Sequence, residues 1–353
     1  MGLHCETNEK RSLFGNHQVN IMRILIVTPL LPPEPGGPSY YSVHLRDALI
    51  KKGHAVSTLA FREVRRYPSI IRHVIFFFKV LRRLRGVEGV IVLDTVSVAL
   101  PAVLAGALAR KKTVVRVGGD FVWERFVERT GEKVLLSEFY TEDRALSRKE
   151  RFLLWVQKNI VLPCASCVVF NTEWQRALWS APYTLALHKT GVVHNAFEKR
   201  ERAHRGGGGF LCAWRPTAFK NTDTLLLAHE LLKKTHPEAV LHVYKNIPRD
   251  ELYAHMAGAH ALVIPSLSEL SPNMAFEALR MGVPVLLTHD CGARDILDGA
   301  VTWIDPRSPE DIARKMALLL HPEAYEQAKK KAASFSYIHT YDDIADEFTR
   351  LLS

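Results

Sequence analysis

The sequence predicts an α/β protein made of two doubly wound, Rossmann-like domains, and three observations support this fold class. Short apolar runs such as residues 24–27 alternate with helical periods, as buried parallel strands alternate with their crossover helices. The alternation restarts at residues 210–214, after a charged and then glycine-only stretch that has the composition of a linker. A length of 353 residues allows two hydrophobic cores. We expect a disordered leader at 1–21, a first domain at 22–197, a linker at 198–209, a second domain at 210–335 and a terminal helix at 336–353.

The first domain is expected to open with a strand at 24–27, a turn rich in proline and glycine, a helix at 40–52 and a strand at 55–59. Gly36 and Gly37 lie in the turn, at the carboxyl end of the first strand, where doubly wound folds bind ligands. The dinucleotide fingerprint G-x-G-x-x-G is absent. The turn therefore predicts a ligand-facing loop without NAD binding, with an ordinary turn as the alternative.

Residues 69–85 are predicted to form a helix with an apolar face and a basic face. The apolar positions are Ile70, Ile71, Val74, Ile75, Phe78 and Leu81, and the basic ones are Arg72, Lys79, Arg82, Arg83 and Arg85. Two interpretations stay open. The helix is an ordinary domain helix with a solvated polar side, or it docks on an anionic membrane surface.

The remaining strands of the first domain are expected at 90–93, 113–117 and 167–170, with helices at 96–110, near 151–162 and after Asn171. The strand at 113–117 ends in Gly118, Gly119 and Asp120, which places Asp120 at the same crevice as the glycine turn. Residues 125–148 have mixed charges and a poor period, and we expect helix and loop there, over the cleft.

The second domain is expected to begin with the strand at 210–214, followed by Arg215, Lys220 and a helix at 222–234. Two cations that converge on a turn between strand and helix suit a nucleoside diphosphate, because its negative charge is spread over several oxygens. A solvated Arg and Lys are the alternative.

The segment 261–288 is expected to form strand, loop, helix and strand. Ser271 is the expected N-cap, Pro272 the first helical residue, and Gly282 the end of the helix. Asn273, Glu277 and Arg280 form one polar stripe on this apolar helix. The helix N-terminus favours a bound phosphate, and Glu269 and Glu277 lie on either side of it. The alternative is an exposed loop acid and a surface pair of Glu277 with Arg280.

These residues resemble the E-x7-E motif of the family-four retaining glycosyltransferases, including the continuation E-A-L-x-x-G-x-P-V. Arg215 and Lys220 are similar to the cations of the family's G-R-L-x-x-x-K-G segment, and Gly36-Gly37 to its P-x-x-x-G-G turn. The chain also departs from the pattern. Leu270-Ser271-Pro272 replaces G-F-G, Asn221 replaces the last glycine of the cation segment, and Asp120 lies where the family often has a histidine.

The resemblance implies a GT-B fold, with two Rossmann-like halves facing across a cleft and a C-terminal helix that crosses back. It implies transfer of a sugar from a nucleoside-diphosphate sugar to an acceptor hydroxyl, with retention, no metal and no cofactor. The acceptor would be a glycan or a lipid-linked glycan of cell-surface polysaccharide or glycolipid biosynthesis. The implied catalytic residues are Glu269 and Asp120. The implied donor-binding residues are Gly36, Gly37, Arg215, Lys220, Leu270, Ser271, Asn273, Met274 and Glu277.

Composition limits the partners. The net charge of +10 favours anionic partners, but the sequence lacks the usual signatures of nucleic-acid binding, so we expect no nucleic acid. Five cysteines in irregular spacing predict a reducing compartment, and hence a cytoplasmic protein, free or peripheral on the inner face of the membrane. Two alternatives to a transferase stay open: a nucleotide-sugar epimerase of the same fold, and a non-enzymatic anion-binding protein.

Overall fold

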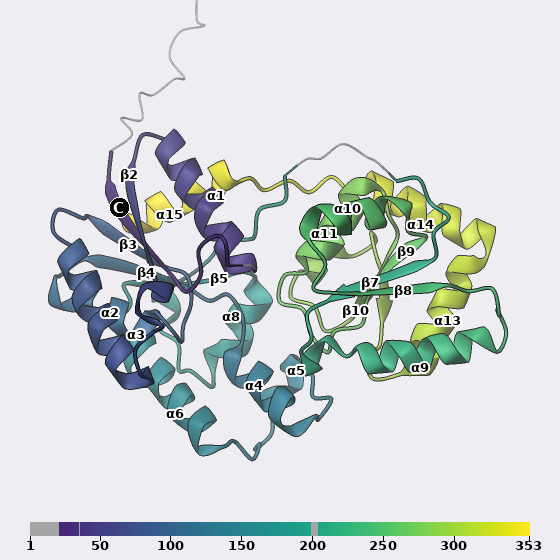
Figure 1. Cartoon of the computed structure of the whole chain (residues 1–353), viewed down its shortest axis with the longest axis horizontal. Helices are drawn as coiled ribbons and strands as arrows, with labels where there is room; N and C mark the ends of the chain where they lie inside the picture. The colour runs from purple at the N-terminus through teal and green to yellow at the C-terminus, as the bar shows by residue number, and fades with distance from the viewer. Residues whose placement is uncertain (1–20, 35, 199–203) are drawn as a thin grey trace, which may run out of the picture.

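Two α/β domains lie side by side in the structure, a computed structural model that describes residues 21–34, 36–198 and 204–353 (Figure 1). Most of the expected leader and residues 199–203 of the expected linker lie outside the described residues. Each domain contains one parallel sheet with helices on both faces, as the sequence predicts.

The first sheet has six parallel strands in the order β2-β1-β3-β4-β5-β6. Its strands are β1 (Arg23–Thr28), β2 (Ala55–Ala60), β3 (Gly89–Val92), β4 (Lys112–Arg116), β5 (Cys167–Phe170) and β6 (Thr190–Val192). The two neighbours of β1 are β2 and β3, in registers that place Ile24 opposite Val56 and Gly89. The strand order reverses at β1, which makes its carboxyl end the topological switch point of this domain.

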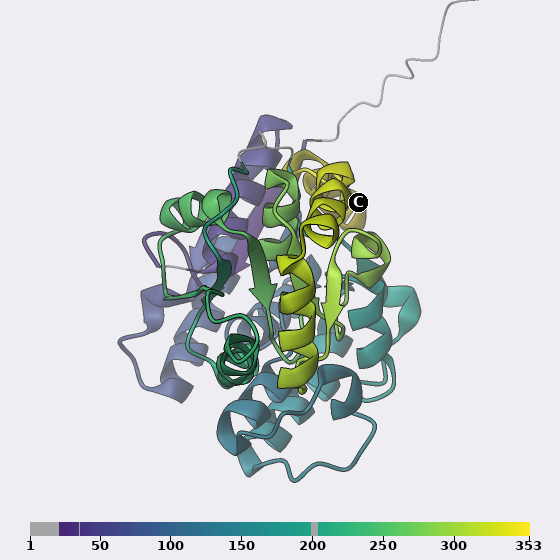
Figure 2. The ribbon, with the colours of Figure 1, turned by 90° about the vertical axis from the view of Figure 1, so that its right-hand side faces the viewer.

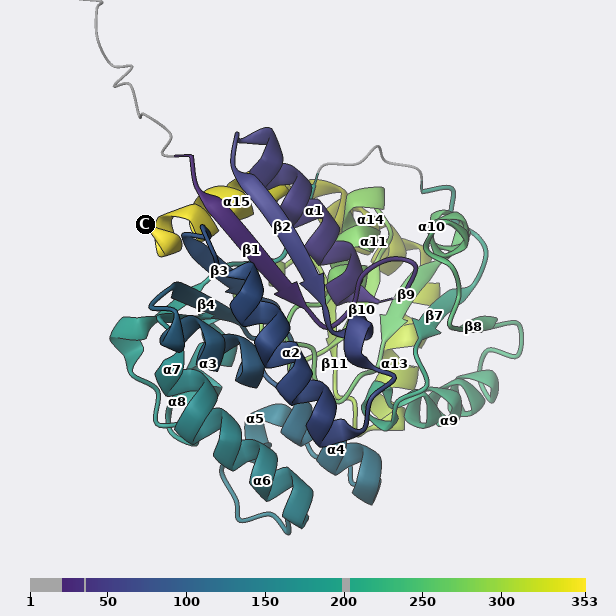
Figure 3. The same cartoon turned by 60° about the vertical axis from the view of Figure 1, so that its left-hand side comes forward.

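Helices form a layer on each face of the first sheet (Figure 3). One layer consists of α2 (Ser69–Arg83), α3 (Ala99–Leu108) and α6 (Arg148–Val156), the last continued by a π-helical turn at Gln157–Val161 and by α7 (Leu162–Cys164). The opposite face is covered by α1 (Gly37–Lys51) and by the last helix of the chain, α15 (Tyr341–Leu352). The domain also contains 3-10 turns at Phe61–Val64 and Leu187–Lys189, and helices α4 (Phe121–Thr130), α5 (Leu136–Phe139) and α8 (Glu173–Ser180).

The second sheet has five parallel strands in the order β8-β7-β9-β10-β11, so β7 is its switch point. Figure 2 views the molecule from the side of this second domain. Its strands are β7 (Phe210–Trp214), β8 (Leu241–Lys245), β9 (Ala261–Ile264), β10 (Val285–Thr288) and β11 (Thr302–Ile304). Its helical elements are a 3-10 turn at Ala218–Lys220, α9 (Thr222–Lys233), α10 (Arg249–Gly258), α11 (Asn273–Met281), α12 (Arg294–Leu297), α13 (Pro309–Leu320) and α14 (Pro322–Ser334). Residues of α9 and α13 fill the core on one face of the sheet, and those of α10 and α11 fill the core on the other.

The chain returns to the first domain at its end, as expected for this fold (Figure 1). Helix α15 buries Ile344, Ala345, Phe348 and Leu352 in the same core as Ile24 and Leu45 of the first domain. Thr340 caps the helix through a capping box with Asp343. Burial of four apolar residues therefore fixes the returning helix to the first domain.

Helix α2 forms where expected but turns a different face to the core. Phe76 and Val80 are its buried residues, whereas much of the apolar stripe read from the sequence faces solvent, with Ile70 82% exposed and Phe78 61% exposed. The helix is apolar on two sides, so its period alone does not select the buried one. In the described part of the chain, no helix has the length and apolarity that a membrane span requires.

Candidate functional site

Several of the predicted site residues gather where the switch points of the two sheets face each other. Arg215 directly follows β7, and the loop with Glu269 follows β9, so both lie at carboxyl ends of neighbouring strands. Gly36 lies in the loop after β1 of the first domain. A Cβ atom built on Gly36 would be 3.9 Å from Nη1 of Arg215, so the two domains approach each other at this point.

Lys220 and Glu269 form an ion pair at the centre of the second-domain site. Lys220 Nζ donates to Glu269 Oε1 at 2.5 Å, and Ser266 Oγ donates to the same oxygen at 2.7 Å. The side chains are 18% and 14% exposed, so solvent screens the pair only in part. The structure thus brings together one cation and one carboxylate that the sequence assigns to neighbouring parts of a donor.

Asn221 explains one departure from the family pattern. Its φ of 55° lies in the left-handed region, where glycine and asparagine are the favoured residues. Its buried amide donates to the carbonyls of Pro265 and Pro306 at 2.9 and 2.6 Å. Asn221 therefore provides the backbone turn of the missing glycine and ties the Lys220 segment to the loop after β9.

Positions 36 and 37 differ in how strongly the backbone requires a glycine there. Gly36 has φ 136° and ψ 159° and precedes the first residue of α1, a conformation that side chains rarely adopt. Gly37 has open space where a Cβ would stand. The fold therefore requires glycine at position 36, while a need for glycine at 37 would have to come from a ligand.

The amino end of α11 is built differently from the expectation. The helix begins at Asn273 with Pro272 as its N-cap, and no side chain caps it. Ser271 is not the cap. Its Oγ and Oδ1 of Asn273 accept hydrogen bonds from Nδ2 of Asn195 at 3.1 and 2.9 Å, across the domain boundary. The Pro272 carbonyl accepts the first intrahelical hydrogen bonds, from the amides of Ala275 and Phe276, so the helix begins one residue later than expected and Ser271 precedes its cap.

Glu277 lies on the predicted polar stripe of α11, but its ion-pair partner is not Arg280 of the same helix. Arg249 of α10 forms an ion pair with Glu277, and Tyr253 Oη donates to it at 3.0 Å. The Arg249 guanidinium also lies 4.1 Å from the ring centroid of Tyr40 in the first domain. Glu277 is thus part of a polar group that extends from α10 to α1.

Leu270 and Met274 support the loop and the helix through packing. Leu270 packs with the cluster of first-domain residues around Trp123, and Met274 with the core of the second domain. A Cβ on Gly292 would lie 2.5 Å from the Leu270 carbonyl oxygen and 2.7 Å from Thr172 Oγ1. Gly292 therefore lets the loop after β9 press against the first domain.

Asp120 does not take the place expected of a group that acts on the sugar. Asp120 is fully buried. Oδ1 accepts from the Trp123 amide at 2.9 Å as the N-cap of α4, and Oδ2 accepts from Tyr140 Oη and Trp179 Nε1, each at 2.8 Å. Burial raises the pKa of Asp120, and these hydrogen bonds oppose the rise. Its carboxylate is committed inside the first domain.

Glu124 is the carboxyl group that sequence reasoning missed. Burial is the largest cause that raises its pKa to about 7, with a further rise from Asp120 and Glu269, whereas Lys220 and Arg215 lower it. A Cβ on Gly119 would lie 2.7 Å from Glu124 Oε1, so glycine at 119 makes room for the carboxyl group. The sequence contained a signal for this position. Glu124 follows the Asp120 cap by four residues, so it lies one turn into α4 on the same side of the helix as the cap.

Direct contacts hold the two halves of the site together. The Trp123 and Phe219 rings lie 5.5 Å apart across the domain boundary. The Leu136 amide donates to Ser268 Oγ at 2.8 Å, and the Ala218 amide to Glu128 Oε2 at 2.7 Å. Residues 121–139 thus pack against the second domain.

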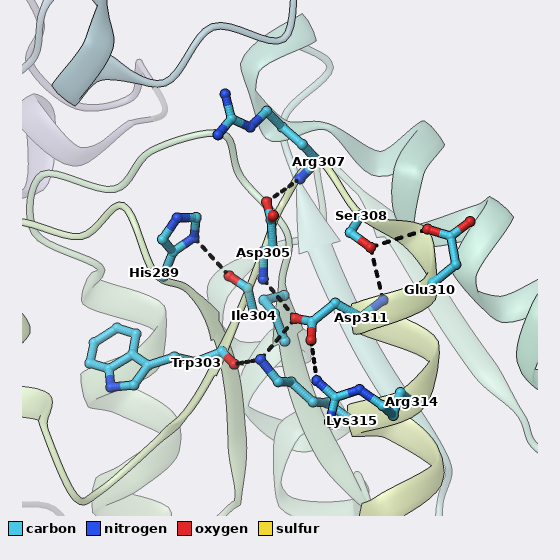
Figure 4. A network of polar contacts seen from close by, with 10 residues as sticks. All are labelled: His289, Trp303, Ile304, Asp305, Arg307, Ser308, Glu310, Asp311, Arg314 and Lys315. Carbon is cyan, nitrogen blue, oxygen red and sulfur yellow. Dashed lines mark hydrogen bonds and ion pairs between the residues drawn. The ribbon is translucent and has the colours of Figure 1, made fainter.

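A second polar group lies at the carboxyl ends of β10 and β11, beside a cavity of about 300 Å³ (Figure 4). Lys315 Nζ donates to Asp311 at 2.8 Å and to the Trp303 carbonyl, and the Asp305 amide donates to Asp311 at 2.9 Å. Although burial raises the pKa of Asp311, these partners lower it below its ordinary value. The charges of Asp311 and Lys315 compensate each other, and their bonds to Trp303 and Asp305 join β11 to α13. Among the described residues, no three His, Cys, Asp or Glu side chains gather as a metal site.

Comparison with known proteins bears on this geometry. A family model described as glycosyl transferases group 1 matches residues 217–335, most of the second domain. No curated protein sequence matches the chain. Among solved structures, sucrose-phosphate synthase from Thermosynechococcus elongatus is similar with a TM-score of 0.67 at 14% identity, over 94% of this chain and 98% of that one.

Two further structures have the same architecture. HepE from Anabaena, solved in complex with UDP-glucose, has a TM-score of 0.63 at 14% identity, over 93% of this chain and 99% of that one. A putative UDP-N-acetylglucosamine 2-epimerase from Listeria monocytogenes has a TM-score of 0.58 at 12% identity, over 94% of this chain and 96% of that one. These likenesses confirm the expected GT-B fold.

Proposed function

We propose that this protein is a glycosyltransferase that moves a sugar from a nucleoside-diphosphate sugar to an acceptor hydroxyl, with retention and without a metal ion. The observation that carries the proposal is the group of Lys220, Glu269 and Arg215 at the β7 switch point, facing the Gly36 loop. This is where doubly wound sheets bind ligands. The match of residues 217–335 to the group 1 family model supports the same chemistry.

The donor diphosphate would bind Arg215 and Lys220. Each is close to the switch point, and a charge-assisted contact is stronger than a neutral one. As the bond between the sugar and the diphosphate breaks, negative charge grows on the departing oxygen, and fixed cations there lower the barrier. Lys220 is held by Glu269, so its position is set before the charge develops.

The carboxylates would bind the rest of the donor. Glu277 accepts from Tyr253 and Arg249, so it is already placed as an acceptor, the role that ribose hydroxyls require. Glu269 would contact the donor sugar, and the loop formed by Leu270, Ser271, Asn273 and Met274 would hold the phosphate and sugar. Glu124, which fills the space beside Gly119 and interacts with the charges of Lys220 and Arg215, would take the place beside the sugar first assigned to Asp120.

The acceptor would be a glycan or a lipid-linked glycan of cell-surface polysaccharide or glycolipid synthesis. In the proposed same-face reaction, the acceptor oxygen forms the new bond to the sugar, and its proton passes to the departing phosphate. A nucleotide-sugar epimerase is the second candidate, because one similar structure is described as a putative enzyme of that kind. It would need no acceptor.

The test combines binding and turnover. A thermal-shift panel of nucleoside diphosphates and their sugars should identify a donor, since a ligand at a hundred times its Kd adds about 2.7 kcal/mol of stability. That donor is then incubated with and without a mixture of lipid-linked and free glycans. We expect release of the nucleoside diphosphate that depends on the acceptor.

Each other outcome has a clear meaning. Conversion of the donor sugar to its epimer without release of nucleoside diphosphate would assign an epimerase and overturn the proposal. Binding of nucleotides without any turnover, across all acceptors, would favour an anion-binding protein. The matched control is Lys234→Ala, at the exposed far end of α9, which should bind and turn over like the parent.

A further inference from the structure

Large apolar side chains are exposed along one helix layer of the first domain. In α2 they form a stripe of Ile70, Ile71, Val74 and Phe78, spaced by three or four residues so that they share one side of the helix. The same layer exposes Leu104 and Leu108 on α3, and Phe152 and Trp155 on α6, with Trp155 54% exposed. Single exposed apolar residues are ordinary, but eight on three neighbouring helices indicate an interaction surface.

The charges of this layer have one sign. Helices α2 and α6 carry Arg72, Lys79, Arg82, Arg83, Arg148, Lys149 and Arg151, and α3 carries no charged residue. The one acidic residue of the three helices is Glu150, which is buried and paired with Arg129 at 3.0 Å. Just outside them, Glu63 pairs with Lys79 at 2.6 Å. The surface is therefore both apolar and positive.

The layer also borders the candidate site. The 3-10 turn that precedes α2 contacts the loop before Gly36: Arg62 Nη1 donates to the Pro32 carbonyl at 2.7 Å, and Arg65 pairs with Glu34. The exposed residues Ile70 and Ile71 follow within the first turn of α2. A partner on this layer would therefore lie close to the Gly36 loop of the candidate site.

We propose that the exposed layer of α2, α3 and α6 docks on an anionic lipid bilayer, with its apolar side chains inserted at the level of the headgroups and its arginines and lysines on the lipid phosphates. Amphipathic helices with basic flanks and exposed Phe, Leu or Trp bind at this depth. A nucleic acid would use the basic residues and leave the eight apolar ones in water. The inference does not depend on sugar transfer.

The test is co-sedimentation of the full chain with vesicles of phosphatidylglycerol and phosphatidylcholine, and with vesicles of phosphatidylcholine alone. We expect binding to the acidic vesicles that weakens as salt rises from about 0.05 M to about 0.5 M. Arg82→Gln with Arg83→Gln should lower partitioning by about 30-fold, since each cation near the surface contributes about 1 kcal/mol and 1.4 kcal/mol is tenfold.

A second variant tests insertion. Phe78→Ser with Ile70→Ser removes two apolar side chains and should lower partitioning by at least about tenfold. Brominated acyl chains should quench tryptophan fluorescence in the parent, and Trp155→Phe should remove most of that quenching. The matched controls lie on the second domain: Lys330→Gln with Lys331→Gln on α14, and Leu226→Ser with Leu227→Ser on α9, exposed residues of the same kinds.

The results distinguish an anionic bilayer from a second copy of the chain as the partner of this layer. Equal effects of the first-domain and second-domain pairs, or equal binding to neutral vesicles, would overturn the proposal. Self-association in light scattering that Phe78→Ser with Ile70→Ser abolishes would assign the layer to a second copy of the chain instead. Unchanged melting temperatures confirm that each variant is folded. Nucleotide binding measured on the same samples shows whether the donor site is intact, so failure here is distinct from failure of the proposed transferase.

Discussion

The two halves of the candidate site differ in how their side chains are held. In the second domain, Lys220 and Glu269 bind each other within one domain, and both come from loops that directly follow neighbouring strands. In the first domain, Glu124, one turn into a helix, interacts with the charges of Lys220 and Arg215, while Asp120 at the end of the strand loop is turned inward.

This difference shows what a motif can determine. In the second domain, short loops at the carboxyl ends of neighbouring strands carry Lys220 and Glu269. Their positions in the sequence therefore predict that the two side chains lie close together. In the first domain, the direction of Asp120 is decided by Trp123, Tyr140 and Trp179, which come from three different segments. No local pattern contains that information.

The largest expected effect comes from the second-domain half. Lys220→Ala should weaken nucleoside-diphosphate binding by about 10- to 150-fold, because a hydrogen bond to a charged group contributes about 1.5–3 kcal/mol. Titration calorimetry measures this, with Lys234→Ala as the control. Unchanged affinity would remove Lys220 from the site and end the contrast between the two halves.

A pair of neighbouring glycines sharpens the contrast on the first-domain side. Gly36→Ala should destabilise the protein by about 1–3 kcal/mol, because its φ of 136° is rarely adopted by other residues. Gly37→Ala has room for its Cβ and should leave stability nearly unchanged. Urea unfolding of both variants measures the difference.

Donor binding then completes the glycine test. If the donor approaches the backbone at Gly37, Gly37→Ala loses affinity while its stability stays near that of the parent. Equal stability of the two variants would show that the Gly36 backbone conformation is not strained for alanine. Parental affinity in Gly37→Ala would place the donor away from this loop.

The sequence predicts the fold to the residue in several places. Strands β5 and β7 have the expected bounds, and α11 ends at Gly282 as expected, because clear breakers follow or precede each of these segments. The apolar stripe read from the sequence of α2 does not identify its buried side, since Phe76 and Val80 face the core whereas Ile70 and Phe78 are exposed. Only the tertiary packing decides between two apolar sides.

The sequence places Lys220 and Glu269 in loops after neighbouring strands, and the structure brings the two side chains together there. The ion pair between them was not predicted, because the sequence assigns the two residues to different parts of a donor. The Ser271 cap was wrong because α11 begins one residue later, with Pro272 as its cap, and the Ser271 hydroxyl accepts from Asn195, which is distant in sequence. Glu277 was expected to pair with Arg280 on the surface or to hold ribose, and its actual partners on α10 could not be read from the helix itself.

Glu124 should make the stability of the first domain depend on pH. Burial is the main cause that raises its pKa to about 7 from an ordinary 4.5, so the folded protein binds this proton more tightly than the unfolded chain. The resulting stability is fully present below about pH 4.5 and is lost as the pH rises through about 7. We expect this loss to be about 2 kcal/mol after allowance for solvent screening.

Urea unfolding at several pH values tests the Glu124 assignment. Between pH 4.5 and 7, the free energy of unfolding of Glu124→Gln should change less with pH than that of the parent. This range runs from the ordinary pKa of the group to its raised pKa. Glu132→Gln, an exposed residue beyond the same helix, should behave like the parent. An unchanged slope in Glu124→Gln would mean that another group titrates.

The last prediction divides the second-domain site itself. Glu277→Gln keeps the shape of the side chain but weakens its pairing with Arg249 and its acceptance from a ribose hydroxyl, so nucleoside-diphosphate affinity should fall by about tenfold. Glu269→Gln keeps Arg215 and the Lys220 charge, and its amide oxygen can still accept from Lys220, while the group beside the sugar loses its charge. It should lower kcat by about tenfold or more while nucleoside-diphosphate affinity changes little. Binding by calorimetry and turnover by diphosphate release separate the two variants, and each needs a parental melting temperature to count. If both variants lost affinity alone, Glu269 would act only by holding Lys220, and the carboxyl chemistry of the site would rest on Glu124 in the first domain.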